Sequence, residues 1–292
     1  MRRLGERTVV AAGIPTRCRE AGDPSTRPPL LLLHGFGDSC LVWEGTQRAL
    51  APRWRTVAPD LPGFGETPAP RELSLATGLR WLTAFTSAVA PHRPLLVGHS
   101  MGGLLALQMA LDRPQDVGGL VLVAPAGIGR ELALSLRLLS LPLVGAWLAR
   151  PSRNGVWATY RSLVSDPACL PADLVEAAYG YLARPGAMAA MLRLLRSGVN
   201  LRGMRPDLVL AGRLAEVQVP TLVVWGRQDP LIPSAYALAA AQGIAGAKLV
   251  LLGNCGHLPM IEHPQEFVAA LERFAASVGD RGMLESWEPH VS

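Results

Sequence analysis

The sequence predicts an α/β fold in which helices cover both faces of a doubly wound, mostly parallel sheet. Short runs of consecutive apolar residues recur along the chain, and longer helix-like segments separate them. Runs without alternation are typical of strands buried on both faces, as in a parallel sheet. The chain has 292 residues, of which 49% are hydrophobic and 17% charged. That composition supplies one large core or two small ones and excludes a mainly disordered chain.

The predicted elements alternate in chain order on the scale of right-handed βαβ units. A hairpin is expected over residues 9–22, with its turn at Gly13-Ile14-Pro15. The strands that follow are expected at 29–35, 55–63, 94–100, 120–126, 220–229 and 247–257. The main helices are expected at 74–90, 101–112, 233–243 and 264–278.

The alternation is interrupted once, over residues 128–214. This stretch contains several short segments rich in leucine, alanine and arginine, separated by prolines, and no convincing strand. We interpret it as a helical cap inserted after the sixth strand, above the carboxyl ends of the strands, where open α/β sheets bind ligands. The predicted domains are therefore a core, formed by 1–127 and 215–292, and a cap over 128–214.

The net charge of +5 comes from scattered arginines, since Lys248 is the only lysine among 28 basic residues. No basic block is interleaved with aromatic residues, so we interpret the charge as codon bias and expect no nucleic-acid partner. The longest apolar stretch, 132–149, contains Arg137 and Pro142. A charge near the centre of a membrane span is expensive, so we expect no transmembrane span.

The four cysteines show no paired or metal-ligand spacing, and no secretory segment is evident near the first residues. Both features favour a cytoplasmic location with free thiols. The Gly35-Phe36-Gly37 segment lacks the continuation of a dinucleotide-binding motif, and no phosphate-binding lysine motif exists. We therefore expect no metal and no organic cofactor.

Ser100 is the candidate nucleophile. The segment Gly98-His99-Ser100-Met101-Gly102 closes one predicted strand and opens a helix, which is the context that the G-x-S-x-G motif requires. Its glycines allow the serine to adopt a strained conformation that projects the hydroxyl above the sheet. We interpret His99 as a packed neighbour, because adjacent residues at such a turn point in different directions.

A serine hydroxyl needs a base that is held in the correct tautomer. His257 follows the last predicted strand directly and is the candidate base. Asp229, at the end of the preceding strand, is the candidate acid that orients it, although an aspartate before a proline is also common in simple turns. Acyl chemistry further needs donors for the developing oxyanion, and we assign the backbone N–H groups of Phe36 and Met101.

Five segments carry a resemblance to a known superfamily: LLLHGFGDS, APDLPGFGET, VGHSMGG, WGRQDPLIP and GNCGHLPMIEHPQEF. They are similar to the signature segments of the α/β-hydrolase fold superfamily, in its order, over about 25–127 and 215–278. The resemblance implies a catalytic triad of Ser100, Asp229 and His257, with an oxyanion hole at Phe36 and Met101. It also implies that Asp60 shapes the loop beside the site without reacting.

The nucleophile narrows the activity, because relatives that use aspartate at this turn, such as haloalkane dehalogenases and epoxide hydrolases, are excluded. We favour a serine esterase that cleaves small-molecule esters of apolar acyl groups. The alternative is a meta-cleavage-product hydrolase that breaks a C–C bond in a dienoate. A non-catalytic binding protein of the same fold is a further alternative. The oligomeric state and the physiological substrate remain open.

Cap residues are expected to select the substrate. Leu132, Leu136, Leu139, Leu143 and Trp147 follow helical spacing, bent at Pro142, and could line an acyl pocket or equally pack on the core. Of these, Leu139, Leu143 and Trp147 are the candidates we assign to substrate binding. A dienoate carboxylate would need a cationic partner, for which Arg184, Arg193 and Arg196 are candidates.

Overall fold

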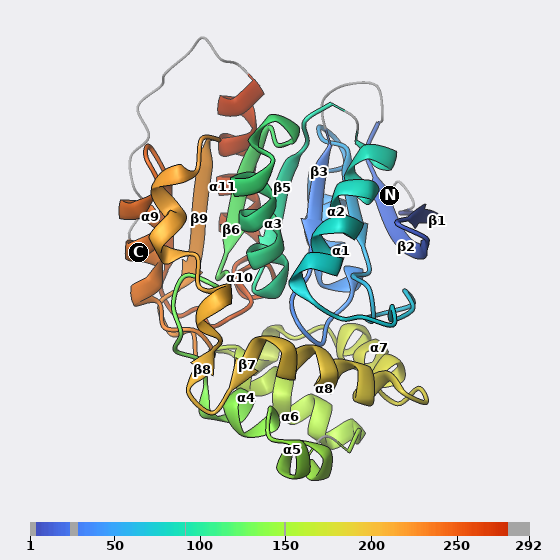
Figure 1. The fold of residues 1–292 in the computed structure, drawn as a ribbon. Coiled ribbons are helices and arrows are strands. Elements are labelled where there is room, and N and C mark those ends of the chain that lie inside the picture. The colour runs from blue at the N-terminus through green and yellow to red at the C-terminus, as the bar shows by residue number, and fades with distance from the viewer. Residues whose placement is uncertain (1–3, 24–28, 91, 149, 280–292) are drawn as a thin grey trace.

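The protein is built around one eight-stranded sheet (Figure 1). The computed structural model describes residues 4–23, 29–90, 92–148 and 150–279, without the side chains of 146–148 and 279. The strands are β1 (Gly5–Ala11), β2 (Ile14–Ala21), β3 (Leu30–Leu33), β4 (Thr56–Pro59), β5 (Leu95–His99), β6 (Gly119–Val123), β9 (Thr221–Gly226) and β10 (Lys248–Leu252). Their order is β1-β2-β4-β3-β5-β6-β9-β10, with antiparallel pairing only between β1, β2 and β4. The predicted doubly wound, mostly parallel sheet is confirmed.

Helices cover both faces of the sheet, and the strand side chains divide between them. Leu31 and Leu33 of β3 face the layer that contains α2 (Leu75–Val89), α3 (Met101–Asp112) and α9 (Ala235–Gly243). Leu30 and Leu32 face the layer that contains α1 (Glu44–Leu50), α10 (Pro259–Glu262) and α11 (Pro264–Gly279). Because both faces are covered, β3 is buried at every residue, which explains its continuous apolar run.

The N-terminal hairpin differs from its prediction in position. The structure turns at Ala12 and Gly13, both with positive φ, and β1 begins at Gly5. The sequence pattern missed residues 5–8 because they are polar. Strand β1 lies at the edge of the sheet and is mostly exposed, so it needs no apolar run. Charged side chains on such an edge also discourage pairing with other chains.

The chain between β6 and β9 forms a separate helical layer at the carboxyl-terminal edge of the sheet (Figure 1). We call residues 128–214 the helical insertion. Its helices are α4 (Leu134–Leu139), α5 (Pro142–Leu148), α6 (Arg153–Leu163), α7 (Ala172–Leu182) and α8 (Ala187–Gly198), followed by the short hairpin β7 (Val199–Asn200) and β8 (Gly203–Met204). That hairpin was not predicted, because two-residue strands leave no pattern. Among the described residues, no helix is both long and apolar enough to cross a bilayer.

Candidate active site

Ser100 occupies the sharp turn between β5 and α3. Its φ is 52° and its ψ is −114°, an unusual conformation for a residue with a side chain. Close packing explains the glycines around it. A Cβ at Gly98 would collide with the backbone of α3, and a Cβ at Gly102 would collide with the end of β3. The backbone N–H of Ser100 donates to the Val123 carbonyl oxygen at 3.0 Å, which ties the turn to β6.

Asp229 and His257 lie together beyond the ends of β9 and β10. The His257 Nδ1–H donates to Asp229 Oδ2 at 2.7 Å, and both side chains are almost fully buried. Oδ2 also accepts from Trp225 Nε1–H at 3.0 Å, and Oδ1 accepts from the N–H groups of Leu231 and Ile232. In a neutral imidazole with its proton on Nδ1, Nε2 carries the free lone pair. This nitrogen is buried and has no hydrogen-bond partner within the described residues.

His99 supports the base without competing with it. Its Nε2–H donates to the backbone carbonyl oxygen of His257 at 2.8 Å, and the two rings lie 4.7 Å apart. Burial lowers the pKa of His99 well below its usual value, so the ring stays neutral. This agrees with the prediction that His99 is a packed neighbour.

The loop after β3 passes directly over the serine turn. A Cβ at Gly35 would lie 2.8 Å from His99 Nδ1 and 3.2 Å from Ser100 Cβ, so only glycine allows this approach. Neither the Phe36 N–H nor the Met101 N–H has a hydrogen-bond acceptor within the described part of the chain. Both residues line the same cavity as Ser100 and His257. The two amides assigned from the sequence are therefore brought to the serine and are available as donors.

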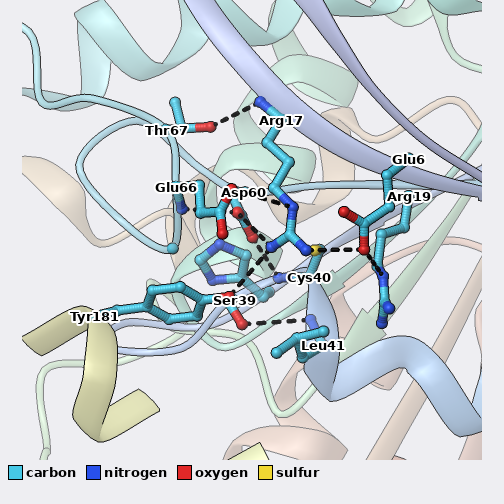
Figure 2. Close-up of polar contacts among 12 residues, drawn as sticks. Glu6, Arg17, Arg19, Ser39, Cys40, Leu41, Asp60, Glu66, Thr67 and Tyr181 are labelled. Carbon is cyan, nitrogen blue, oxygen red and sulfur yellow. Dashed lines mark hydrogen bonds and ion pairs between the residues drawn. The ribbon is translucent and has the colours of Figure 1, made fainter. Parts of the chain in front are cut away.

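A network behind this loop holds it in place (Figure 2). Asp60 is fully buried and accepts hydrogen bonds from the N–H groups of Cys40 and Glu66 at 2.7 and 2.9 Å. Arg17 Nη1 lies 3.4 Å from the Asp60 carboxylate and donates to the Tyr181 hydroxyl of α7 at 3.2 Å. The network thus joins the loops after β3 and β4 to the helical insertion. Asp60 stabilises this junction and does not line the cavity.

The cavity in front of Ser100 has a volume of about 630 Å³ and is lined mostly by apolar side chains from the core and the insertion. Leu132, Leu136 and Leu139 line it, as do Met191 and Leu195 of α8, which the sequence analysis did not single out. Leu143 does not line it, because the chain breaks between α4 and α5 and turns this side chain outward, where it is 86% exposed. The Trp147 side chain lies outside the described residues.

The predicted arginines are not in the cavity. Arg184 stacks on Tyr181 and donates to the Gly65 carbonyl oxygen, and Arg193 is exposed on α8. Arg196 donates to the carbonyl oxygens of residues 140–142. The guanidinium groups of these long side chains reach backbone carbonyl oxygens or solvent at the surface, so none of the three lies in the apolar cavity. Arg150, which is exposed, is the one arginine or lysine that lines the cavity among the described residues.

Asp38 and Tyr160 form a buried pair on the cavity wall that the sequence analysis missed. The Tyr160 hydroxyl donates to Asp38 Oδ1 at 3.2 Å, and this oxygen also accepts from the Ser39 N–H at 2.8 Å. Burial raises the pKa of Asp38 to about 7, although both hydrogen bonds act in the opposite direction. Asp38 directly follows the His-Gly-Phe-Gly segment, a signal that could have identified it. Nothing in the sequence marks Tyr160 as its partner.

We predict that Asp38→Asn removes a loss of folding stability that the wild-type protein undergoes as the pH rises. The raised pKa means that the folded protein keeps a proton on Asp38 that the unfolded chain loses near pH 3.8, so stability falls as the pH rises from about 4 to about 7. Asparagine keeps the acceptor oxygen and carries no charge. The unfolding free energy of the variant minus that of wild type should increase by on the order of 1–3 kcal/mol from pH 4 to pH 8, as measured by urea unfolding. Asp207→Asn, at an exposed aspartate, is the control. An equal variant-to-wild-type difference at both pH values would refute the prediction.

Within the described residues, no group of three His, Cys, Asp or Glu side chains is arranged to hold a metal ion. The side chains that the structure brings together at the end of the sheet are instead a serine, a histidine and a buried carboxylate, with two free amides. This arrangement can activate a hydroxyl nucleophile and stabilise an oxyanion.

Comparisons with known proteins agree with this geometry. The model of the Alpha/beta hydrolase family matches residues 30–270. A pimeloyl-[acyl-carrier protein] methyl ester esterase from Aeromonas hydrophila is 32% identical over 251 residues, covering 85% of this chain and 95% of the esterase. A 2-hydroxymuconate semialdehyde hydrolase from Pseudomonas putida is 32% identical over 288 residues, covering 92% and 94%. The crystal structure of a bacterial membrane phospholipase A superposes with a TM-score of 0.80 at 27% identity, covering 95% and 87%.

The family model spans most of the chain and includes the loops that carry Ser100, Asp229 and His257. The mostly parallel eight-stranded sheet with helices on both faces agrees with the same family. The protein belongs to the alpha/beta hydrolase family and is a hydrolase.

Proposed function

We propose that the protein is a serine esterase that cleaves small-molecule esters with apolar acyl groups through an acyl-enzyme. In this proposal Ser100, His257 and Asp229 form the catalytic triad. The Phe36 and Met101 N–H groups form the oxyanion hole, and the helical insertion acts as the cap that selects the substrate. The observation that carries the proposal is the unpartnered, buried Nε2 of His257, whose Nδ1–H is held by Asp229.

The reaction proceeds in two halves. Ser100 Oγ attacks the ester carbonyl carbon while His257 Nε2 takes the hydroxyl proton, and the carbonyl oxygen gains a negative charge facing the two amides. The tetrahedral intermediate collapses, the C–O bond to the alcohol breaks, and His257 returns the proton to the departing alkoxide. A water molecule then attacks the acyl-enzyme with His257 again as base, which releases the carboxylic acid and restores the serine.

The cavity supports an apolar acyl group. Its walls near Ser100 are mostly aliphatic, and the charged side chains that line it are few: Asp38, Glu72 and Arg150. A volume of about 630 Å³ is within the range of sites that enclose small organic molecules. Each buried methylene contributes about 0.8 kcal/mol, so kcat/KM should rise up to about fourfold per added CH₂ until the cavity is full.

C–C bond hydrolysis of a dienoate is the second candidate. The similarity to 2-hydroxymuconate semialdehyde hydrolase favours it, because that relative matches nearly the full length of the chain. The distribution of cations disfavours it. A dienoate carries a carboxylate, and Arg184, Arg193 and Arg196 are all engaged or exposed away from the cavity. Arg150 is the one described cavity residue that could pair with that carboxylate.

The two candidates separate in one experiment. We predict that p-nitrophenyl esters of increasing chain length are hydrolysed with rising kcat/KM, and that a meta-cleavage dienoate is a poor substrate. A dienoate turned over faster than every ester, with the rate lost in Arg150→Gln, would establish the second candidate.

The role of the insertion is tested by a matched pair of leucines. Leu139→Phe places extra volume in the cavity and should lower kcat/KM for the longest good ester about tenfold while sparing the acetate ester. Leu143→Phe adds the same volume at a side chain that faces solvent, so the chain-length profile should stay unchanged. Equal effects of both substitutions on all esters would show that the insertion does not select the acyl group.

A further inference from the structure

The helical insertion carries an unusual distribution of charge. Residues 132–165 contain four arginines, residues 177–206 contain five, and neither stretch contains an aspartate or a glutamate. Over the whole chain, by contrast, 28 basic residues are nearly balanced by 23 acidic residues. The excess of positive charge is therefore concentrated in the insertion.

Some of these arginines are neutralised from outside the two stretches. Arg153 pairs with Glu176, Arg184 with Glu66 and Arg205 with Asp207. Arg137 and Arg196 instead donate to backbone carbonyl oxygens, which joins α4 to the β7–β8 turn and α8 to the start of α5. Within the described residues, neither of these two guanidinium groups has an ion-pair partner, so their positive charge persists.

Large apolar side chains are exposed in the same region. Leu134 of α4, Leu143 and Val144 of α5, and Leu201 in the β7–β8 turn are 60%, 86%, 39% and 46% exposed. These elements are neighbours, since α4 packs against both α5 and β7. Figure 1 shows α5 at the end of the molecule farthest from the sheet. We call Leu134, Arg137, Leu143, Val144, Leu201 and Arg202 the tip surface.

We propose that the tip surface docks onto the face of an anionic lipid bilayer. Exposed leucines gain free energy by entering the boundary between headgroups and acyl chains, and arginines beside them are attracted to anionic headgroups. Arginine side chains can also lay their methylene stems along apolar surroundings while the guanidinium stays among the headgroups. Exposed aliphatic side chains beside arginines without ion-pair partners fit a lipid surface better than a second copy of the chain or a nucleic acid.

Two other occupants fit less well. A second copy of the chain would bring like-charged arginines of two tip surfaces against each other, which is unfavourable. A nucleic acid would attract the arginines but would give Leu143 and Leu201 no apolar environment to enter. Of these three partners, the lipid surface alone matches both the charge and the exposed leucines.

Docking through the tip surface would turn one opening of the cavity toward the bilayer. Ser135 and Arg150 are among the exposed residues that line the cavity, so the cavity has one opening at the start of α4 and after α5, beside the tip surface. Docking would therefore bring this opening to the lipid surface. Access of the site to esters in the membrane rests on the proposed esterase function. Binding of the protein to the bilayer does not depend on that function.

Vesicle binding tests the proposal without turnover. The full chain should sediment with vesicles of phosphatidylglycerol and phosphatidylcholine, and at least tenfold less with vesicles of phosphatidylcholine alone. Binding should weaken as salt is raised, because headgroup attraction is screened. No sedimentation with either vesicle, or equal binding to both, would overturn the proposal. A loss of ester turnover with intact vesicle binding would count only against the proposed function.

Matched variants locate the surface. Leu143→Ser should reduce binding to the anionic vesicles about tenfold, since an inserted leucine contributes roughly 1.5 kcal/mol or more. Arg202→Gln should reduce binding about fivefold, the equivalent of about 1 kcal/mol for one charge near the bilayer. Leu238→Ser, at a half-exposed leucine on α9 of the core, and Arg80→Gln, on α2, are the controls and should bind as wild type.

The control variants test whether binding depends on the tip surface specifically. Equal losses in Leu143→Ser and Leu238→Ser would show that the tip surface is not the docking site and would overturn the proposal. The variants should keep the melting temperature of wild type, because these side chains are exposed. A dimer that forms without vesicles and dissociates in Leu143→Ser would assign the surface to a second copy and would also overturn it.

Discussion

Replacing Ser100 by alanine is expected to lower kcat by about 10⁴–10⁶-fold and to leave the fold unchanged. The loss is large because the proposed acyl-enzyme cannot form without the hydroxyl. The fold persists because the turn is set by the close packing of Gly98 and Gly102 and by the hydrogen bond from residue 100 to Val123, all of which an alanine retains. The measurement is steady-state hydrolysis of a p-nitrophenyl ester together with a melting curve.

Ser135 provides the control for this substitution. It is another serine on the wall of the same cavity, but it lies on α4 in the helical insertion, away from the serine turn. Ser135→Ala should change kcat less than about threefold. If Ser100→Ala kept a tenth of the wild-type rate, the assignment of the nucleophile would be wrong.

Asp229→Asn should lower kcat about 10⁴-fold. The two Asp229 oxygens face only donors: the amides of Leu231 and Ile232 on one side, and the N–H groups of Trp225 and His257 on the other. An asparagine NH₂ must oppose donors on one of these sides. If it faces His257, it can only donate to Nδ1, which forces the proton onto Nε2 and removes the lone pair that accepts the serine proton.

Trp225→Phe is the matched control, because it removes one donor to the same Asp229 oxygen and keeps the bond to His257. We expect lower stability from the lost buried volume but a kcat within about tenfold of wild type. If Asp229→Asn reduced kcat no more than Trp225→Phe, the carboxylate would serve only to stabilise the loop after β9.

The positions of the proposed catalytic residues could be predicted because these residues lie in short segments at strand ends. Ser100 directly follows the buried strand β5, whereas Asp229 and His257 lie in the loops after β9 and β10, and the carboxyl ends of these parallel strands meet at one edge of the sheet. Once the strands are located, the topology brings these residues together. The same reasoning placed the Phe36 amide beside the serine, where Gly35 allows the close approach.

The walls of the cavity could not be predicted in the same way. Leu139 and Leu143 share a helical face only if one helix runs through both, and the structure ends α4 at Leu139 and begins α5 at Pro142. Proline fits the first position of a new helix and does not fit a helix interior, so Pro142 breaks the run where the sequence analysis expected a bend. After the break the spacing no longer predicts which side chains face the cavity.

Contacts between residues far apart in the chain could not be predicted for a related reason. The Asp38–Tyr160 pair and the Arg17–Tyr181 bond both join the core to the helical insertion across more than a hundred residues. Local patterns predict that such helices exist but do not predict how they lie on the sheet. The partners of Arg137 and Arg196 could not be predicted either, because they are backbone carbonyl oxygens whose positions depend on how the helices pack.

Covalent labelling tests directly whether Ser100 is an activated nucleophile, as we propose. The protein is incubated with an alkyl fluorophosphonate, digested, and examined by mass spectrometry to locate the adduct. We predict one phosphonyl group per chain, on the peptide that contains Ser100, and almost no labelling in Ser100→Ala. An unlabelled wild-type protein, or an adduct on any other residue, would contradict the assignment of Ser100 as the nucleophile.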